Sequence, residues 1–80
     1  MPQAAESPRR FSVHPRAVDR HHARIVEETS FEAAAVAYVE DVHPPVDAAN
    51  EVSVIVRDLD DGREHCFRID LDTGETVSCG

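Results

Sequence analysis

The sequence predicts an α+β fold, in which an antiparallel β-sheet of four to five strands is covered on one face by a single α-helix. Three observations predict it: one apolar stripe at helical spacing, two glycine-containing turns between β-rich segments, and a short alternating segment near the start. The element order is β-β-α-β-β-β or β-α-β-β-β. A chain of 80 residues makes one domain. We assign this domain to residues 9–80 and expect residues 1–8 to form a disordered N-terminal tail.

The helix is predicted by "TSFEAAAVAYVEDV" at residues 29–42. Apolar side chains recur there at the spacing of one helix face: Phe31, Ala34, Ala35, Tyr38, Val39 and Val42. Thr29 or Ser30 is the N-cap, and with Thr29 as the cap Glu32 completes a capping box worth about 1 kcal/mol. Pro44 and Pro45 end the helix.

The strands are predicted by β-rich segments. In "RRFSVHPR", Phe11 and Val13 alternate with polar residues until Pro15 ends the strand. "ARIVEE" is a second, shorter candidate. After the helix, the turn sequences "DDG" and "DTG" separate three further segments: "EVSVIVRDL", "REHCFRIDL" and "ETVSC".

The strand registers follow from the turns. A two-residue Asp61-Gly62 turn sets three apolar pairs on the face toward the helix: Val56 with Phe67, Val54 with Ile69, and Val52 with Leu71. A three-residue turn that ends at Gly74 then places Val77 opposite Ile69 and Cys79 opposite Phe67, on the same face. The opposite face of the sheet is left open to solvent.

Charge excludes several classes of partner. The net charge is −8 at pH 7, which argues against binding to nucleic acids or anionic membranes. Residues 1–24 hold five of the eight arginines, but no aromatic platform accompanies them, so we expect them to neutralise the acidic surface or to bind an acidic partner. There is no apolar run of ~18 residues and no secretory leader, so we expect a cytoplasmic protein that does not enter membranes.

The segment "EHCFRID" raises the question of a thiol paired with an imidazole. Neighbouring strand residues point to opposite faces, so His65 should face the helix and Cys66 the open face, beside Arg57 and Arg68. With Cys79 on the helix side, the two cysteines are not expected to bond. One alternative remains open, because the arginines could lower the pKa of Cys66 and make this a thiol-dependent protein.

The candidate ligands for zinc, calcium or a cofactor do not have the sequence spacing that such sites require. The histidines do not form a zinc-binding pattern, although a small-ligand or metal-binding protein centred on them stays an alternative: His14, His21, His22, His43 and His65. "DLDDGRE" and "DLDTGE" miss the EF-hand spacing, and turn chemistry explains their acids. Phosphate-binding loops and hydrolase motifs are absent, so we expect no cofactor and no enzyme activity.

At "RFSVHPR", "ETSFEAAAVAYVEDV" and "CFRIDL" the chain resembles an uncharacterised family of short bacterial proteins with the same order of elements, over about residues 9–72. The strand–strand–helix–strand order is also similar to that of HicB-type antitoxins, which implies an antitoxin-like protein as a further alternative. Neither resemblance carries over site residues.

The preferred hypothesis is a non-catalytic interaction or regulatory module that binds a protein partner or a second copy of itself. An apolar residue and two arginines on an otherwise polar face suggest that the open sheet face is the binding surface. The candidate residues are Ile55, Arg57, Cys66, Arg68 and Asp70, together with Ser53, Thr76 and Ser78. An exposed strand edge is the other surface that could pair with a partner.

Overall fold

The computed structural model describes residues 8–18, 20–44, 46 and 48–79. The elements are β1 (Arg9–Pro15), a short 3-10 helix η1 (Arg20–His22), β2 (Arg24–Glu28), α1 (Phe31–Val42), β3 (Glu51–Asp58), β4 (Glu64–Asp70) and β5 (Thr76–Ser78). The longer of the two predicted orders, β-β-α-β-β-β, is therefore confirmed. The predicted tail, apart from Pro8, lies outside the described residues.

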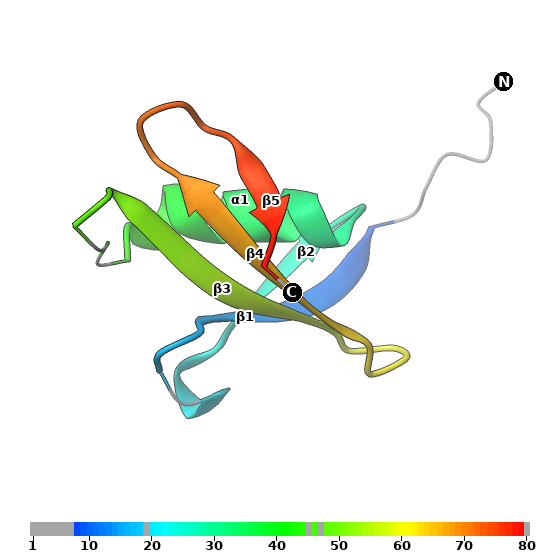
Figure 1. The fold of residues 1–80 in the computed structure, drawn as a ribbon. Helices are drawn as coiled ribbons and strands as arrows, with labels where there is room; N and C mark the ends of the chain where they lie inside the picture. Colours follow the sequence, from blue (N-terminus) through cyan, green and yellow to red (C-terminus); the bar gives the residue numbers. More distant parts are fainter. Residues whose placement is uncertain (1–7, 19, 45, 47, 80) are drawn as a thin grey trace, which may run out of the picture.

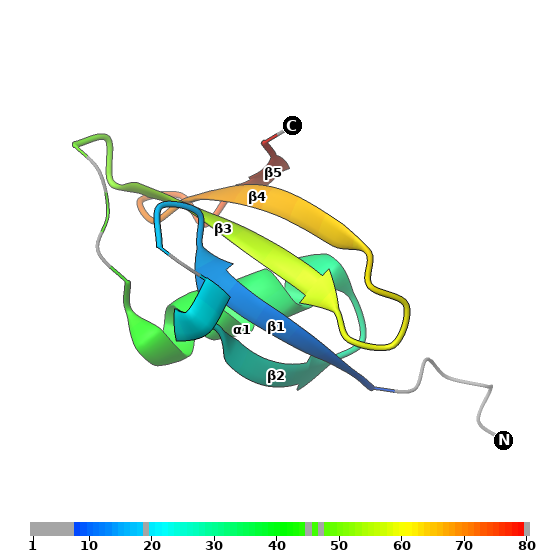
Figure 2. The same cartoon turned by 90° about the horizontal axis from the view of Figure 1, so that it is seen from below.

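The five strands form one antiparallel sheet in the order β2-β1-β3-β4-β5. Helix α1 lies across one face of this sheet, as the two views of the ribbon show (Figures 1 and 2). Among the described residues, no helix covers the other face. The α+β class and the single helical layer are as predicted.

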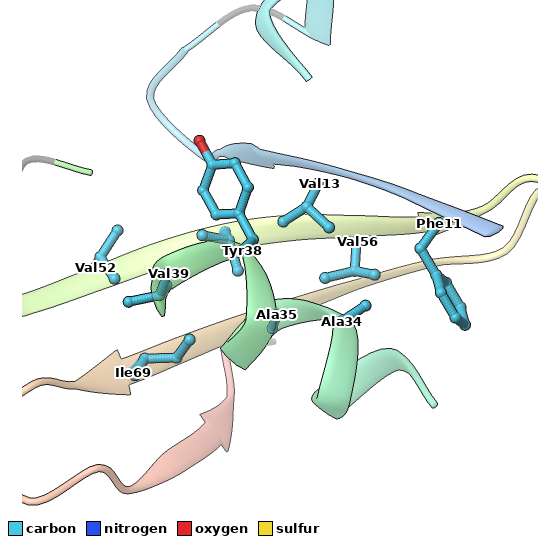
Figure 3. Packing of buried hydrophobic residues seen from close by; sticks show 10 residues of the cluster. Phe11, Val13, Ala34, Ala35, Tyr38, Val39, Val52, Val56 and Ile69 are labelled. Atoms are coloured by element: carbon cyan, nitrogen blue, oxygen red, sulfur yellow. The ribbon is translucent and has the colours of Figure 1, made fainter. Parts of the chain in front are cut away.

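The core lies between α1 and the sheet (Figure 3). The predicted helix stripe supplies the helix side of the core, with Ala34 and Ala35 fully buried and Tyr38 and Val39 nearly so. The strands supply the rest: Phe11, Val13, Val52, Val54, Val56 and Ile69. The two alanines keep the helix close to the strands because their side chains are small. Burial also raises the pKa of Tyr38, and the nearby Arg24 guanidinium partly offsets that rise.

The helix begins one residue later than the capping box requires. Ser30 is the N-cap, and its Oγ accepts a hydrogen bond from the Ala33 amide at 3.1 Å. Glu32 therefore stands in the first turn but not at the N3 position, so the predicted Thr29 capping box is wrong. At the other end His43 adopts a left-handed conformation, with φ 53°, and its N–H donates to the Val39 carbonyl, which ends the helix before Pro44.

Replacing Ser30 with alanine is expected to lower the free energy of unfolding by about 1 kcal/mol, because the Ala33 amide loses its partner. Thr29→Ala is the matched control, since Thr29 is also exposed but is not the cap. Urea denaturation of both variants would measure the difference. Equal losses in the two variants would show that Ser30 does not cap the helix.

The β3–β4 turn has four residues, 59–62, instead of the predicted two. Val54 lies opposite Phe67 and Val56 opposite His65. The Asp58 side chain explains the longer loop, because its Oδ1 accepts from the Asp60 amide at 2.7 Å. Gly62 closes the loop, with φ 80° and its N–H 2.8 Å from the Asp58 carbonyl oxygen. The shift of two residues leaves every β3 and β4 side chain on its predicted face.

The β4–β5 turn repeats the same four-residue geometry over residues 71–74. Asp70 Oδ1 accepts from the Asp72 amide at 2.8 Å, and the Gly74 N–H lies 2.7 Å from the Asp70 carbonyl oxygen. The predicted turn had three residues, one too few. The additional residue moves every β5 side chain to the opposite face of the sheet. Val77 lies opposite Arg68 and is 38% exposed. Leu71, which was predicted to face Val52, is 38% exposed within the turn.

Candidate functional site

The open sheet face carries the five principal residues of the predicted binding surface. The register sets Ile55 opposite Cys66 and Arg57 opposite Glu64. Ser53 stands opposite Arg68, and Glu51 opposite Asp70. In β3 the burial alternates strictly, with residues 52, 54, 56 and 58 buried and those between them only half-buried. Thr76 and Ser78, which were also predicted on this face, lie instead opposite Ile69 and Phe67, because of the one-residue error in the β5 register.

Strand β2 adds a residue that sequence reasoning missed. Ile25 pairs with Ser12 and is 57% exposed, whereas its neighbour Val26 packs against the core. Two adjacent apolar residues in "RIVEE" give no alternation, so the sequence could not show which of them faces outward.

A shallow hollow lies on the open face between Ile25 of β2 and Arg57 of β3. It is lined by Ser12, His14, Ala23, Ile25, Arg57, Leu59 and Glu64. Leu59, from the β3–β4 turn, is a second exposed apolar side chain at its rim, with 41% of its surface exposed. The His14 ring is oriented by the turn after β1, with Nδ1 2.9 Å from the Pro15 carbonyl oxygen and 3.0 Å from that of Val18. The hollow therefore combines apolar, basic and acidic groups on one exposed surface.

The charges on this face are loosely paired. Arg57 Nη1 lies 4.0 Å from Glu64 Oε2, and Arg68 Nε lies 3.7 Å from Glu51 Oε1. Pairs of this kind at the surface contribute only about 0–1 kcal/mol. Both arginines can therefore exchange their present partners for a carboxylate of another protein at little cost.

Two arginines of the basic N-terminal segment pair with acids of this chain. Arg9 Nη1 lies 2.8 Å from Asp58 Oδ2, and Arg24 Nη1 lies 3.2 Å from Asp41 Oδ2. The Arg24–Asp41 contact agrees with the expectation that the segment neutralises the acidic surface, whereas Asp58, the partner of Arg9, is fully buried.

A disulfide joins Cys66 and Cys79, contrary to the prediction that these cysteines do not bond. Their Cα atoms are 5.3 Å apart, and the Cys79 amide donates to the Cys66 carbonyl at 2.9 Å. The prediction was wrong because the longer β4–β5 turn moves Cys79 to the open face. In this form Cys66 is not a free thiol.

His65 points away from Cys66, as the strand alternation predicts. Its ring centroid lies 4.3 Å from that of Phe31 and 6.2 Å from that of Phe67. Within the described ranges no group of three or more histidine, cysteine or acidic side chains is placed to hold a metal ion. His65 is therefore part of an aromatic cluster on the helix side of the sheet.

The aromatic cluster continues to a buried acid that sequence reasoning also missed. The Phe11 and Phe31 rings lie 5.1 Å apart, with the Arg9 guanidinium carbon 5.4 Å and 5.9 Å from their centroids. The same guanidinium pairs with Asp58, which is fully buried. Asp58 Oδ2 receives no well-angled hydrogen bond from the described residues, so its neutralisation depends on Arg9. The group closes one end of the core and has a structural role.

The described helices include none that is both long and apolar enough to cross a membrane. No curated protein and no solved structure matches the sequence. A family model described as "Family of unknown function (DUF5961)" matches residues 9–80, which confirms the resemblance to an uncharacterised family and extends it to the last residue. With 72 of its 80 residues matched, the chain belongs to the DUF5961 family.

Proposed function

We propose that this chain is a non-catalytic interaction module that binds a protein partner through its open sheet face. The observation that carries the proposal is Ile25, which is 57% exposed at the hollow that it shares with Arg57. An apolar side chain beside an arginine is typical of the centre of a protein interface.

The arrangement of the sheet supports this proposal. Ile25, Ile55 and Val77 belong to three different strands of the face that α1 leaves uncovered. Ile25 and Ile55 rest on a rigid scaffold, because their strand neighbours Val26, Val54 and Val56 pack into the core. A partner would bury apolar surface here and replace the loose ion pairs of Arg57 and Arg68. The proposal includes a regulatory role, because a module that binds without catalysis can have an effect only by changing the activity of its partner.

The cytoplasmic location that the sequence favours stays a prediction. The Cys66–Cys79 bond bears on it directly, because stable disulfides are rare in reducing compartments. Fractionation of the cells that produce the protein, with thiols alkylated at lysis, would measure both the location and the redox state.

Ile25→Asp is expected to abolish capture of the partner while leaving the protein folded, because Ile25 contributes little to the core. Val46→Asp is the matched control, since Val46 is 40% exposed in the loop after α1 and not in a strand. Immobilised wild type and both variants would be incubated with an extract of the producing cells, and bound proteins would be compared by mass spectrometry. Circular dichroism would confirm that each variant is folded.

The expected partner binds the wild type and Val46→Asp but not Ile25→Asp. Light scattering of the purified chain, with Arg68→Glu as a second variant, separates self-association from binding to another protein. A wild type that is monomeric and captures the same proteins as Ile25→Asp would contradict the proposal.

A further inference from the structure

Strand β5 is held to the sheet by few contacts apart from the disulfide. It has three residues and pairs with β4 only, from Phe67 to Ile69. None of its residues belongs to the buried core, and Val77 is 38% exposed. Hydrogen bonds to β4 therefore carry most of its non-covalent attachment. Strands that bury so little apolar surface open readily.

The disulfide lies at the end of β5 that is remote from the 71–74 turn. The turn secures one end of the strand, through the hydrogen bond from the Asp70 amide to the Glu75 carbonyl at 2.9 Å. At the other end, the Cys79 amide donates to the Cys66 carbonyl, and the S–S bond reinforces that contact. The bond thus joins the two strands at the point where β5 would otherwise fray.

The disulfide is also within reach of a reductant. Both cysteines are only half-buried, and they line an open hollow with Arg16, Ile55 and Glu64. Attack on a disulfide requires access of a thiolate to one of the two sulfurs. The hollow provides that access from the open face of the sheet.

We propose that Cys66–Cys79 is a reversible thiol–disulfide exchange site whose reduction by a dithiol releases β5 from β4. A thiolate of the dithiol attacks one sulfur, so that the S–S bond breaks, a mixed disulfide forms and the departing cysteine thiolate takes up a proton. The second thiol of the reductant then displaces the remaining cysteine. Two electrons pass to the protein, which ends with two thiols, while the reductant ends as a disulfide. The released strand uncovers the backbone edge of β4 at residues 67–69.

Hydrogen exchange of the full chain, with and without dithiothreitol, tests this proposal, which is independent of the proposed partner. After reduction, the Val77 and Cys79 amides, which the register turns toward β4, are expected to exchange between about 10- and 100-fold faster, because the cross-link no longer restrains the strand. The α1 and β3 amides should change by less than about 2-fold. Removal of dithiothreitol and addition of oxidised glutathione should restore the original protection.

Cys79→Ser serves as a reductant-independent reference. It should exchange like the reduced wild type, whether or not dithiothreitol is present. Unchanged β5 protection in the reduced protein would overturn the proposal, as would failure to reoxidise. A loss of α1 and β3 protection on reduction would overturn it as well, since the bond would then stabilise the whole domain and not one strand.

Discussion

Replacing Phe11 with alanine is expected to lower the free energy of unfolding by about 3–5 kcal/mol. Phe11 is fully buried on β1. Its ring contacts that of Phe31, the first residue of α1, at one end of the core. The core has few large side chains, because most of its members are alanine and valine. The surrounding residues therefore cannot fill the cavity that the missing ring would leave.

This loss is comparable with the whole stability of an 80-residue domain, which is about 4–12 kcal/mol. The variant should therefore unfold at a much lower urea concentration, or be partly unfolded without urea. Ile25→Ala is the matched control, because Ile25 is an apolar residue of the adjacent strand but is 57% exposed, and its loss should stay near about 0.5 kcal/mol. A Phe11→Ala loss below about 1 kcal/mol would show that this end of the core is not closely packed.

The fold class could be predicted because the helix stripe and the β3 alternation are strong and independent signals. The stripe from Phe31 to Val42 gave the correct helix face, and all its members are buried or half-buried. In β3 the valines at every second position, 52, 54 and 56, indicate the correct sheet face. The two faces were compatible with one arrangement only, that of a sheet covered by a helix on its apolar side.

The hairpin registers could not be predicted from apolar matching alone. In the first hairpin any even shift matches the valines with Phe67 and Ile69 on one face, so this matching does not distinguish a two-residue turn from a four-residue turn. In the second hairpin a one-residue error reversed β5 and hid the disulfide. A signal was present in the sequence: Asp58-Leu59-Asp60-Asp61-Gly62 and Asp70-Leu71-Asp72-Thr73-Gly74 share one pattern. Side-chain hydrogen bonds give both turns four residues.

The candidate site was predictable only where the strand register allowed it. Ile55 and Arg57 follow from alternation in β3, and this alternation survives the error in loop length. Ile25 does not follow, because its orientation depends on the tertiary packing of Val26 against the core and not on any local pattern. The burial of Asp58 could not be predicted either, because it also depends on tertiary packing. In the sequence Asp58 resembles an ordinary turn acid, and only the fold places Arg9 and Phe11 beside it.

The similar turns at residues 59–62 and 71–74 allow a controlled measurement of how much the buried charge of Asp58 contributes to the free energy of unfolding. Asp58→Ala removes a turn hydrogen bond and also leaves Arg9 without its carboxylate. Asp70→Ala removes the equivalent turn hydrogen bond, but Asp70 is only half-buried on the open face. We expect losses of about 2–4 kcal/mol for Asp58→Ala and about 1 kcal/mol for Asp70→Ala. The loss expected for Asp58→Ala is smaller than that for a fully buried ion pair. The reason is that 40% of the Arg9 side chain is exposed, so solvent screens its charge.

A double-mutant cycle with Arg9→Ala identifies the source of the difference. Arg9→Ala leaves the Asp58 carboxylate buried without compensation, so this single variant should be strongly destabilised. Adding Asp58→Ala then removes the buried charge, and the double variant should be no less stable than Arg9→Ala. Urea unfolding of the four proteins measures the coupling, for which we expect about 1–3 kcal/mol. If Asp58→Ala and Asp70→Ala cost the same and the coupling is zero, then Asp58 acts only as a turn residue, and the end of the core is closed by the phenylalanine rings alone.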